Sequence, residues 1–172
     1  MVAAEYLRVR AGDRILDIGC GVADILESID DDVEYVGFDP NPSYVAAAVA
    51  RYGHRATFTT ASVGLEVPSD SFSIVIAIGV LHHLDDDDAT TLFDPARNAL
   101  TTGGRFVSVD PTFVSDQPRI ARALIKADRG RCVRTPDELE ALAHPILPDV
   151  RINVRTDLLR MPYTHAILTA SK

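Results

Sequence analysis

The sequence predicts an α/β domain, in which a mostly parallel β-sheet carries helices on both faces. Strand-like and helix-like segments alternate along the chain, as they do when crossover helices join parallel strands. The near-continuous apolar run at 73–78 is typical of a central strand that is covered on both faces. A chain of 172 residues has the size of one domain, and we expect residues 1–172 to form a single unit.

The first part of the chain predicts three strands and two helices. We expect strands at 14–18, 35–38 and 56–60. A helix at 22–29 is indicated by apolar residues at helical spacing, which are Ile25, Leu26 and Ile29. Asn41 and Pro42 mark the start of a second helix, and Gly53 marks its end. The apolar stripe of this helix consists of Tyr44, Val45, Ala48, Val49 and Tyr52.

The middle of the chain predicts a loop, a strand, a helix and another strand. A loop or single turn is expected at 61–71, which contains Gly64 and Pro68. After the central strand, the acidic run at 85–88 opens a helix whose buried stripe is Leu92, Ala96, Ala99 and Leu100. A turn at 101–104 then precedes a strand at 105–109.

The last part predicts two helices and a pair of strands. A helix is expected at 117–127, with Ile120, Leu124 and Ala127 on one face. Thr135 and Glu138 have capping-box spacing, and Pro136 suits the first position of the helix that they open. Strands at 150–156 and 163–169 are separated by too few residues for a crossover helix, so we expect them to be antiparallel.

Composition and charge exclude several classes of function. The net charge of −8 argues against non-specific nucleic-acid binding, which requires a basic face. The two cysteines, Cys20 and Cys132, form no CxxC pair and imply no disulfide framework. The amino-terminal residues lack the pattern of a signal peptide, and the longest apolar run, 74–81, is too short to cross a membrane. We therefore expect a cytoplasmic protein without a membrane partner.

A glycine turn directly after the first strand predicts a nucleoside cofactor. Gly19 and Gly21 allow the chain to turn sharply and a ligand to approach the backbone. Asp39 follows 20 residues after Gly19 at the end of the second strand, where an acid accepts hydrogen bonds from ribose hydroxyls. A dinucleotide fingerprint would place a third glycine at Asp24, whose carboxylate would also repel a pyrophosphate. A nicotinamide-dependent oxidoreductase is therefore the less favoured alternative.

Three segments resemble the motifs of one known family. Residues 15–23 are similar to its first motif, Leu-Asp-Ile-Gly-Cys-Gly. Residues 71–84 are similar to its fourth strand, which runs into Val-Leu-His-His-Leu, and residues 100–106 to its Leu-x-Pro-Gly-Gly turn. The resemblance spans roughly residues 14 to 170. It is to the class I S-adenosylmethionine-dependent methyltransferases with a Rossmann-like fold, in the small-molecule group of types 11 and 25.

The resemblance implies a fold, a cofactor and a set of cofactor residues. The fold is a seven-stranded sheet of order 3-2-1-4-5-7-6, with strand 7 antiparallel. The cofactor is S-adenosyl-L-methionine, with S-adenosyl-L-homocysteine as its product. Asp39 matches the family's ribose acid, whereas Ser62 or Ala61 stands where members often carry an acid for the adenine. The implied cofactor residues are Asp17, Gly19, Cys20, Gly21, Asp39, Pro40, Ser62, Ile78 and Gly79.

The substrate side carries three candidate catalytic residues. His82 and His83 follow the fourth strand and suit a general base or a hydrogen-bond partner, although a packing or capping role is the alternative. Asp110 ends the fifth strand at the edge of the sheet where ligands bind. No metal is expected, because helix capping explains the acidic run at 85–88 better than an oxygen-ligand loop does.

The segment 111–134 is a candidate substrate lid. It leaves the active-site edge and holds a group of cations that predicts an anionic small-molecule substrate, with a solvated helix face as the alternative. These cations are Arg119, Arg122, Lys126, Arg129, Arg131 and Arg134. Only 13 residues precede the first strand, so an open cofactor site, this lid, a partner or further upstream residues are the alternatives there.

These observations favour an enzyme that transfers a methyl group to an oxygen, nitrogen or carbon atom of a small molecule. Such a transfer is an in-line displacement, which depends mainly on alignment of the reacting atoms. The first alternative is a non-catalytic protein that binds S-adenosylmethionine and needs a partner.

Overall fold

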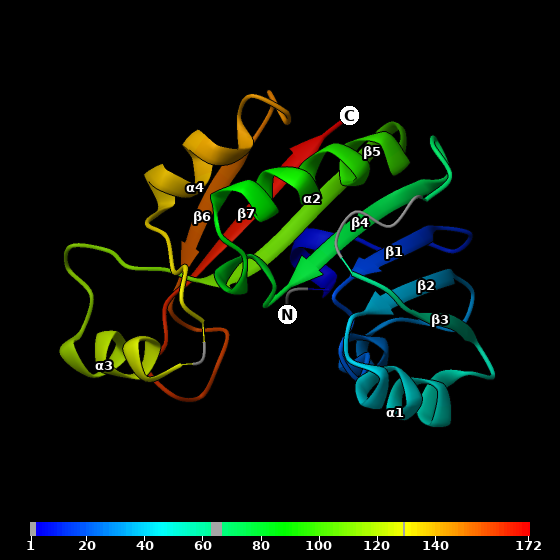
Figure 1. The fold of residues 1–172 in the computed structure, drawn as a ribbon, viewed down its shortest axis with the longest axis horizontal. Coiled ribbons are helices and arrows are strands. Elements are labelled where there is room, and N and C mark those ends of the chain that lie inside the picture. The colour runs from blue at the N-terminus through cyan, green and yellow to red at the C-terminus, as the bar shows by residue number, and fades with distance from the viewer. Residues whose placement is uncertain (1–2, 63–66, 129) are drawn as a thin grey trace.

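The computed structural model describes residues 3–62, 67–128 and 130–172, and one seven-stranded sheet runs through them. The strand order is β3-β2-β1-β4-β5-β7-β6, with β7 antiparallel to both of its neighbours (Figure 1). The predicted fold class is therefore confirmed, including the antiparallel pair at the end. The strands are β1 (Arg14–Ile18), β2 (Glu34–Asp39), β3 (Ala56–Thr60), β4 (Phe72–Ile78), β5 (Leu100–Pro111), β6 (Arg151–Arg155) and β7 (His165–Ser171).

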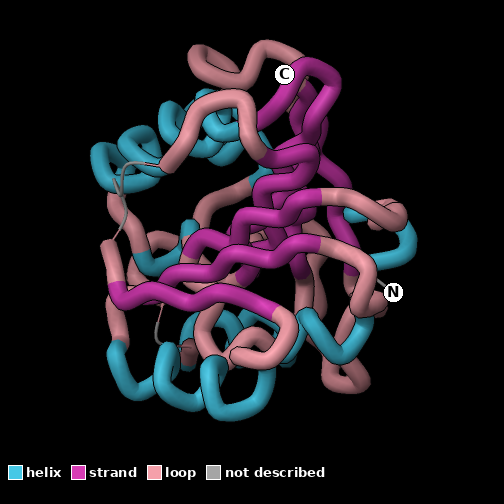
Figure 2. Tube along the Cα trace, turned by 90° about the vertical axis from the view of Figure 1, so that its right-hand side faces the viewer, coloured by secondary structure: helices cyan, strands magenta, loops and turns pink. Residues whose placement is uncertain are grey.

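Helices cover both faces of the sheet, so that two hydrophobic cores form (Figure 2). The core on one face lies between the sheet and two helices, to which Leu92 and Leu139 belong. The core on the other face includes Leu7, Leu26 and Ala48. The helices are α1 (Pro42–Tyr52), α2 (Asp86–Ala99), α3 (Arg119–Ala127) and α4 (Pro136–Ala143), with the short helical turns η1 (Ala3–Leu7), η2 (Asp24–Ser28) and η3 (Leu81–His83).

Three predicted helix starts are confirmed by their capping contacts, whereas the helix predicted from residue 117 begins at Arg119 without a side-chain cap. The side chain of Asn41 accepts the N–H of Ser43 at 2.9 Å, and that of Asp85 accepts the N–H of Asp88 at 2.9 Å. At α4 both halves of the capping box form between Thr135 and Glu138. These contacts satisfy amide groups that the first turn of each helix leaves free.

The helix predicted at 22–29 is wrong, because the structure forms only the five-residue 3₁₀ turn η2 there. Gly21 and Ala23 adopt left-handed backbone angles, with φ of +54° and +59°, which delay the start of the helix. Ile29 is already extended (φ −122°), and three aspartates follow it. The segment is therefore too short for an α-helix, although Leu26 and Ile29 are buried as expected.

Two predicted apolar faces also need correction. On α1, Val45 and Ala48 are buried, but Tyr44 and Val49 are exposed. On α3, Ile120 is 66 % exposed and Ala127 is exposed too, whereas Ala121 and Ile125 are buried. On both helices the buried face is displaced from the one that the apolar pattern indicated, because tertiary packing selects which residues are covered.

The turn predicted at 101–104 lies inside β5 as an irregularity of the ladder. Leu100 pairs with Phe72 and Arg105 with Ile74, so the extra residues of β5 bulge out between them.

In the loop predicted at 61–71, residues 63–66, and with them Gly64, lie outside the described residues. In the described part of the chain, no helix has the length and apolar character needed to cross a membrane.

Candidate functional site

A cavity of about 920 Å³ opens at the carboxyl ends of β1, β2 and β4. In doubly wound sheets ligands bind at this edge, where strand order reverses. The turn at 19–21, the end of β2 and the residues after β4 all contribute to the wall. The predicted cofactor residues in the wall are Asp17, Gly19, Cys20, Gly21, Asp39, Pro40, Ile78 and Gly79. Ser62, in contrast, is exposed and is not a wall residue.

The carboxylate of Asp39 is held in place by two backbone amides. One oxygen accepts the N–H of Gly21 at 3.0 Å, and the other accepts the N–H of Asn41 at 2.8 Å. Each carboxylate oxygen has a second acceptor site, so both remain able to accept from a ligand hydroxyl. Asp39 is largely buried, so its orientation is set before any ligand arrives.

The glycine turn takes the backbone through angles that favour glycine. Gly19 has φ of +72° and Gly21 has φ of +54°. A Cβ at Gly19 would lie 2.6 Å from Cγ2 of Val80, whereas a Cβ at Gly21 would meet no atom within 4 Å. Gly19 is therefore required for packing as well as for the turn, and the side of Gly21 stays open toward the cavity.

Asp17 is a buried acid with one unused oxygen. Its Oδ2 accepts the hydroxyl of Tyr35, whereas Oδ1 is buried without a hydrogen-bond partner. Burial raises the pKa of Asp17 to about 7, with a smaller rise from Asp39, and the Tyr35 hydrogen bond opposes that rise. Such a group suits a ligand that brings a positive charge or a donor to Oδ1.

Cys20 fills the turn as a small apolar side chain. Its thiol is buried, and burial together with the nearby Asp17 and Asp39 carboxylates raises its pKa to about 12. A thiol with that pKa is protonated at neutral pH and is a poor nucleophile.

The three candidate catalytic residues are neighbours, but only His83 lies in the cavity wall. The His82 ring packs 4.0 Å from the His83 ring, centroid to centroid. His82 is buried behind this contact, and its Nδ1 lies 2.9 Å from Oδ1 of Asp110. Partial burial and the His82 ring lower the pKa of His83, so that the His83 imidazole is neutral at neutral pH.

Several wall residues were not expected from the sequence. Tyr44 reaches the cavity from the first turn of α1, directly after the Asp39 segment. Asp24 also lies in the wall and forms an ion pair with Arg51. Tyr44 follows Asp39 closely in the sequence, which indicated a place near the cofactor site. The apolar pattern instead assigned Tyr44 to the buried stripe of the helix. The other unexpected wall residues are Ile18, Val22, Ile25, Ser28, Phe38, Asn41 and Leu84.

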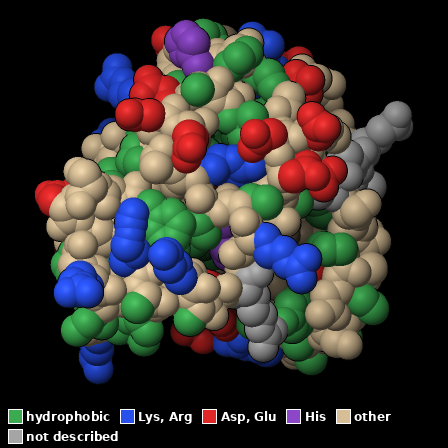
Figure 3. All heavy atoms as spheres, turned by 60° about the vertical axis from the view of Figure 1, so that its left-hand side comes forward, with side chains coloured by type: hydrophobic (Ala, Val, Ile, Leu, Met, Phe, Trp, Pro, Cys, Tyr) green, Lys and Arg blue, Asp and Glu red, His purple; other side chains and the backbone are tan. Residues whose placement is uncertain are grey.

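The basic segment 111–134 has exposed cations on α3. Its last cation, Arg134, is instead hydrogen-bonded within the fold. Basic side chains gather on the lower part of this face of the molecule and acidic ones on the upper part (Figure 3). Arg119, Arg122 and Lys126 are exposed, and Arg122 lies over the ring of Phe113 at 5.0 Å. Arg129 lies outside the described residues.

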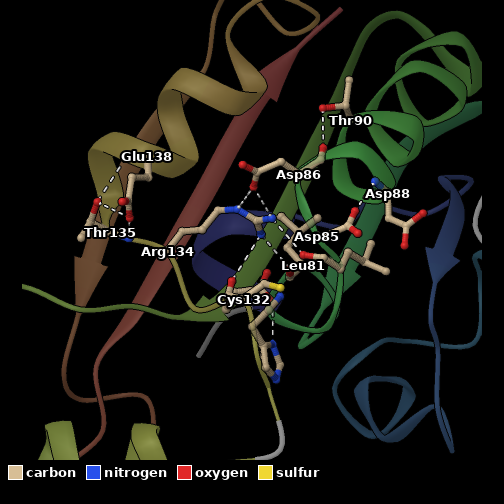
Figure 4. Close-up of polar contacts among 12 residues, drawn as sticks. Leu81, Asp85, Asp86, Asp88, Thr90, Cys132, Arg134, Thr135 and Glu138 are labelled. Atoms are coloured by element: carbon tan, nitrogen blue, oxygen red, sulfur yellow. Dashed lines mark hydrogen bonds and ion pairs between the residues drawn. The ribbon is translucent and has the colours of Figure 1, made fainter.

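Arg134 connects the end of this segment to η3 and α2 (Figure 4). Its guanidinium donates to the carbonyls of Leu81 and Leu84, both at 2.9 Å, and pairs with Asp86 at 2.7 Å. The Arg134 side chain is only 10 % exposed, so it has a structural role and does not face a substrate.

Among the described residues, no group of His, Cys, Asp or Glu side chains could hold a metal ion.

Comparison with known proteins finds a matching family and two curated methyltransferase relatives. The family described as "Methyltransferase domain" matches residues 15–104, which is more than half of the chain. The chain is 34% identical over 87 residues to a ubiquinone biosynthesis O-methyltransferase of Bradyrhizobium, covering 48% of this chain and 34% of that protein. It is 34% identical over 115 residues to the 27-O-demethylrifamycin SV methyltransferase of Amycolatopsis mediterranei, covering 62% of this chain and 42% of that protein. The chain thus spans well under half the length of these curated relatives.

Solved structures agree with the fold. A SAM-dependent methyltransferase of Methanosarcina mazei superposes with a TM-score of 0.76 at 16% identity, over 100% of this chain and 98% of that chain. The phosphoethanolamine N-methyltransferase 2 of Haemonchus contortus, in complex with S-adenosyl-L-methionine, gives a TM-score of 0.75 at 16% identity, over 95% of this chain and 49% of that chain. At such identities the likeness shows the fold alone.

Proposed function

The chain belongs to the methyltransferase domain family of class I S-adenosylmethionine-dependent methyltransferases, and from this premise we propose that it methylates a small molecule. The observation that carries the proposal is the single cavity that joins Asp17, the turn at 19–21 and Asp39. When bound there, S-adenosylmethionine supplies a methyl group made electrophilic by its sulfonium.

The residues of the cavity fit this cofactor. Asp17 has a buried oxygen without a partner, which suits the cofactor's α-ammonium group. Asp39 has acceptor sites left for the two ribose hydroxyls. The open side of Gly21 leaves the backbone accessible to a ligand. Cys20, Pro40, Ile78 and Gly79 would complete the wall around it.

His83 is the candidate catalytic residue on the acceptor side. An acceptor hydroxyl arrives protonated, so a base within reach assists its attack on the methyl carbon. The lowered pKa of His83 keeps its ring neutral and able to take that proton. Both curated relatives are named for oxygen methylation, or for a substrate with a free oxygen, which favours an oxygen acceptor. His82 would then support the His83 ring by packing against it, and His82 is itself held by its contact with Asp110.

We infer that the segment 111–134 covers the acceptor as a lid. It leaves β5 at the cavity edge of the sheet and returns to η3 through Arg134. Of the cations that predicted an anionic acceptor, Arg134 is committed elsewhere and Arg122 lies over Phe113. Among the described cations of the segment, Arg119, Lys126 and Arg131 are then the candidates for contact with an anionic acceptor. Charge reversal at Arg131 should weaken binding of such an acceptor, and unchanged affinity would count against it.

Calorimetry with three ligands tests the proposal. S-adenosylmethionine and S-adenosylhomocysteine should both bind, whereas NAD should not. Absence of binding by both sulfur nucleosides would contradict the proposal, and binding of NAD would favour an oxidoreductase. Formation of S-adenosylhomocysteine should then be followed with a panel of phenols, sugars and amines. Cofactor binding without turnover on any of them would favour the non-catalytic alternative.

A further inference from the structure

Besides the His83 ring, the His82 ring has three neighbours, two of which, Asp110 and Gly130, lie far from it in the sequence. On one edge, its Nδ1 lies 2.9 Å from Oδ1 of Asp110 at the end of β5. On another, its Cε1 lies 3.8 Å from where a Cβ of Gly79 would be. On the third, a Cβ at Gly130 would lie 2.1 Å from its Cδ2, so the returning lid segment packs directly on the ring. Cys132 donates its N–H to the carbonyl of His82 at 3.0 Å, which joins the same segment to the backbone.

The contacts of Asp110 determine which ring nitrogen carries the proton. The same Oδ1 that faces Nδ1 also accepts the backbone N–H of His82 at 3.2 Å. A carboxylate oxygen only accepts, so Nδ1 is the protonated nitrogen. In the neutral ring Nε2 then keeps its lone pair, and it lies between Cε1 and Cδ2, the two atoms that face Gly79 and Gly130. Since Gly79 lines the cavity, this edge of the ring lies between the cavity wall and the lid.

We propose that Asp110 is a positioning residue for methyl transfer, which holds His82 in one orientation and one tautomer and thereby supports His83 at the cavity wall. The proposal rests on the proposed function, because it gives His83 a reaction to assist. Asp110 does not touch the cavity itself, and it acts only through His82. Its burial, at 3 % exposure, removes competing water from the contact and strengthens it.

The position of the His82 ring also explains the glycine at residue 130 of the lid segment. Thr112, two residues after Asp110, donates its hydroxyl to the carbonyl of Arg134 at 2.8 Å, so both ends of the lid segment are joined beside His82. A side chain at Gly130 would displace either the His82 ring or the lid. The lid is thus anchored on the histidine turn, and its middle part, which contains α3, extends away from it (Figure 1).

Nitrogen-15 NMR of labelled histidines tests this proposal without any acceptor. The signals of His82 are assigned by their loss in His82→Gln. At about pH 9, where an imidazole carries a single ring proton, His82 in the unaltered protein should show a protonated Nδ1 and an unprotonated Nε2, in a single tautomer. Asp110→Asn retains an acceptor oxygen and should keep this pattern, whereas Asp110→Ala should give a mixture of tautomers. A protonated Nε2 in the unaltered protein, or an unchanged tautomer in Asp110→Ala, would overturn the proposal.

Two controls separate positioning from loss of the fold. Ser108 is buried on the same strand without a hydrogen-bond partner for its hydroxyl, so Ser108→Ala should leave the His82 tautomer unchanged. Affinity for S-adenosylhomocysteine should stay within about twofold in Asp110→Ala, because Asp110 does not line the cavity. If S-adenosylhomocysteine fails to bind the unaltered protein, the proposed function fails while the tautomer result still stands. Gly130→Ala is a second variant. Its added Cβ would displace the His82 ring, so His82 should again show a mixture of tautomers.

Discussion

The carboxylate of Asp39, at the end of β2, accepts the backbone N–H of Gly21 in the turn after β1 at 3.0 Å. This contact joins the two strongest sequence motifs of the chain across the cavity wall. It means that Asp39 both orients the glycine turn and offers its oxygens to a ligand.

Replacing Asp39 by Ala should therefore weaken the binding of S-adenosylhomocysteine by about 1–3 kcal/mol, or roughly 5- to 150-fold. The loss combines the ribose hydrogen bonds with a looser turn at Gly21. Calorimetry gives the affinity directly. Asp31→Ala removes an exposed acid elsewhere and should leave the affinity unchanged. Equal affinities for Asp39→Ala and the unaltered protein would show that the ligand does not use this carboxylate.

Comparison of Gly19 with Gly103 separates the backbone role of glycine from its packing role. Both have left-handed backbone angles, with φ of +72° and +76°, but only a Cβ at Gly19 would meet a neighbour, Val80. Alanine at either position should cost about 1–2 kcal/mol of folding free energy through backbone strain. Gly19→Ala should cost more, because Val80 must move, and should also weaken cofactor binding. Urea unfolding and calorimetry on both variants measure the difference, and equal losses would argue against the packing role of Gly19.

The raised pKa of Asp17 predicts a stability that depends on pH. Between its ordinary pKa and about 7, the folded protein keeps a proton on Asp17 that the unfolded chain has released. The contribution of Asp17 is therefore fully present at low pH and is lost as pH rises toward 7, by up to about 1.4 kcal/mol per pH unit. Asp17→Asn should remove this slope in urea unfolding of the ligand-free protein. Parallel pH profiles for the two proteins would refute the assignment.

Tyr35→Phe provides the complementary test of the same acid. The Tyr35 hydroxyl donates to Asp17 and lowers the pKa of Asp17, against the effect of burial. Without that donor the pKa should rise further, so the loss of stability should extend to higher pH than in the unaltered protein. A shift of the midpoint to lower pH would be inconsistent with this arrangement.

Arg134 and Arg131 should behave differently although both are cations of the lid segment. Arg134→Met leaves the carbonyls of Leu81 and Leu84 without their donor and should destabilise the fold by about 2–4 kcal/mol. Arg131 is exposed, so Arg131→Met should change stability by less than about 0.5 kcal/mol. Thermal unfolding compares the two variants. An Arg134→Met protein as stable as Arg131→Met would mean that the contacts to η3 contribute little.

The sequence by itself determined the features that depend on neighbouring residues. The helix starts at Asn41, Asp85 and Thr135 were predictable, because a cap needs only its own side chain and the next amides. The strand bounds of β1 and β3 were predicted to the residue, because strand-forming residues and the turn residues that bound them form a local pattern. The glycine turn and Asp39 were likewise readable from their spacing.

Only the tertiary structure decided which side chains meet across the fold. It replaced the helix predicted at 22–29 by a short turn, and it buried Ala121 in place of Ile120 on α3. It committed Arg134 to η3 and placed Asp110 behind His82, with His83 alone of the three candidates at the cavity. These outcomes depend on contacts between residues far apart in the chain. A local pattern shows that a side chain is charged or apolar, but only packing determines what lies against it.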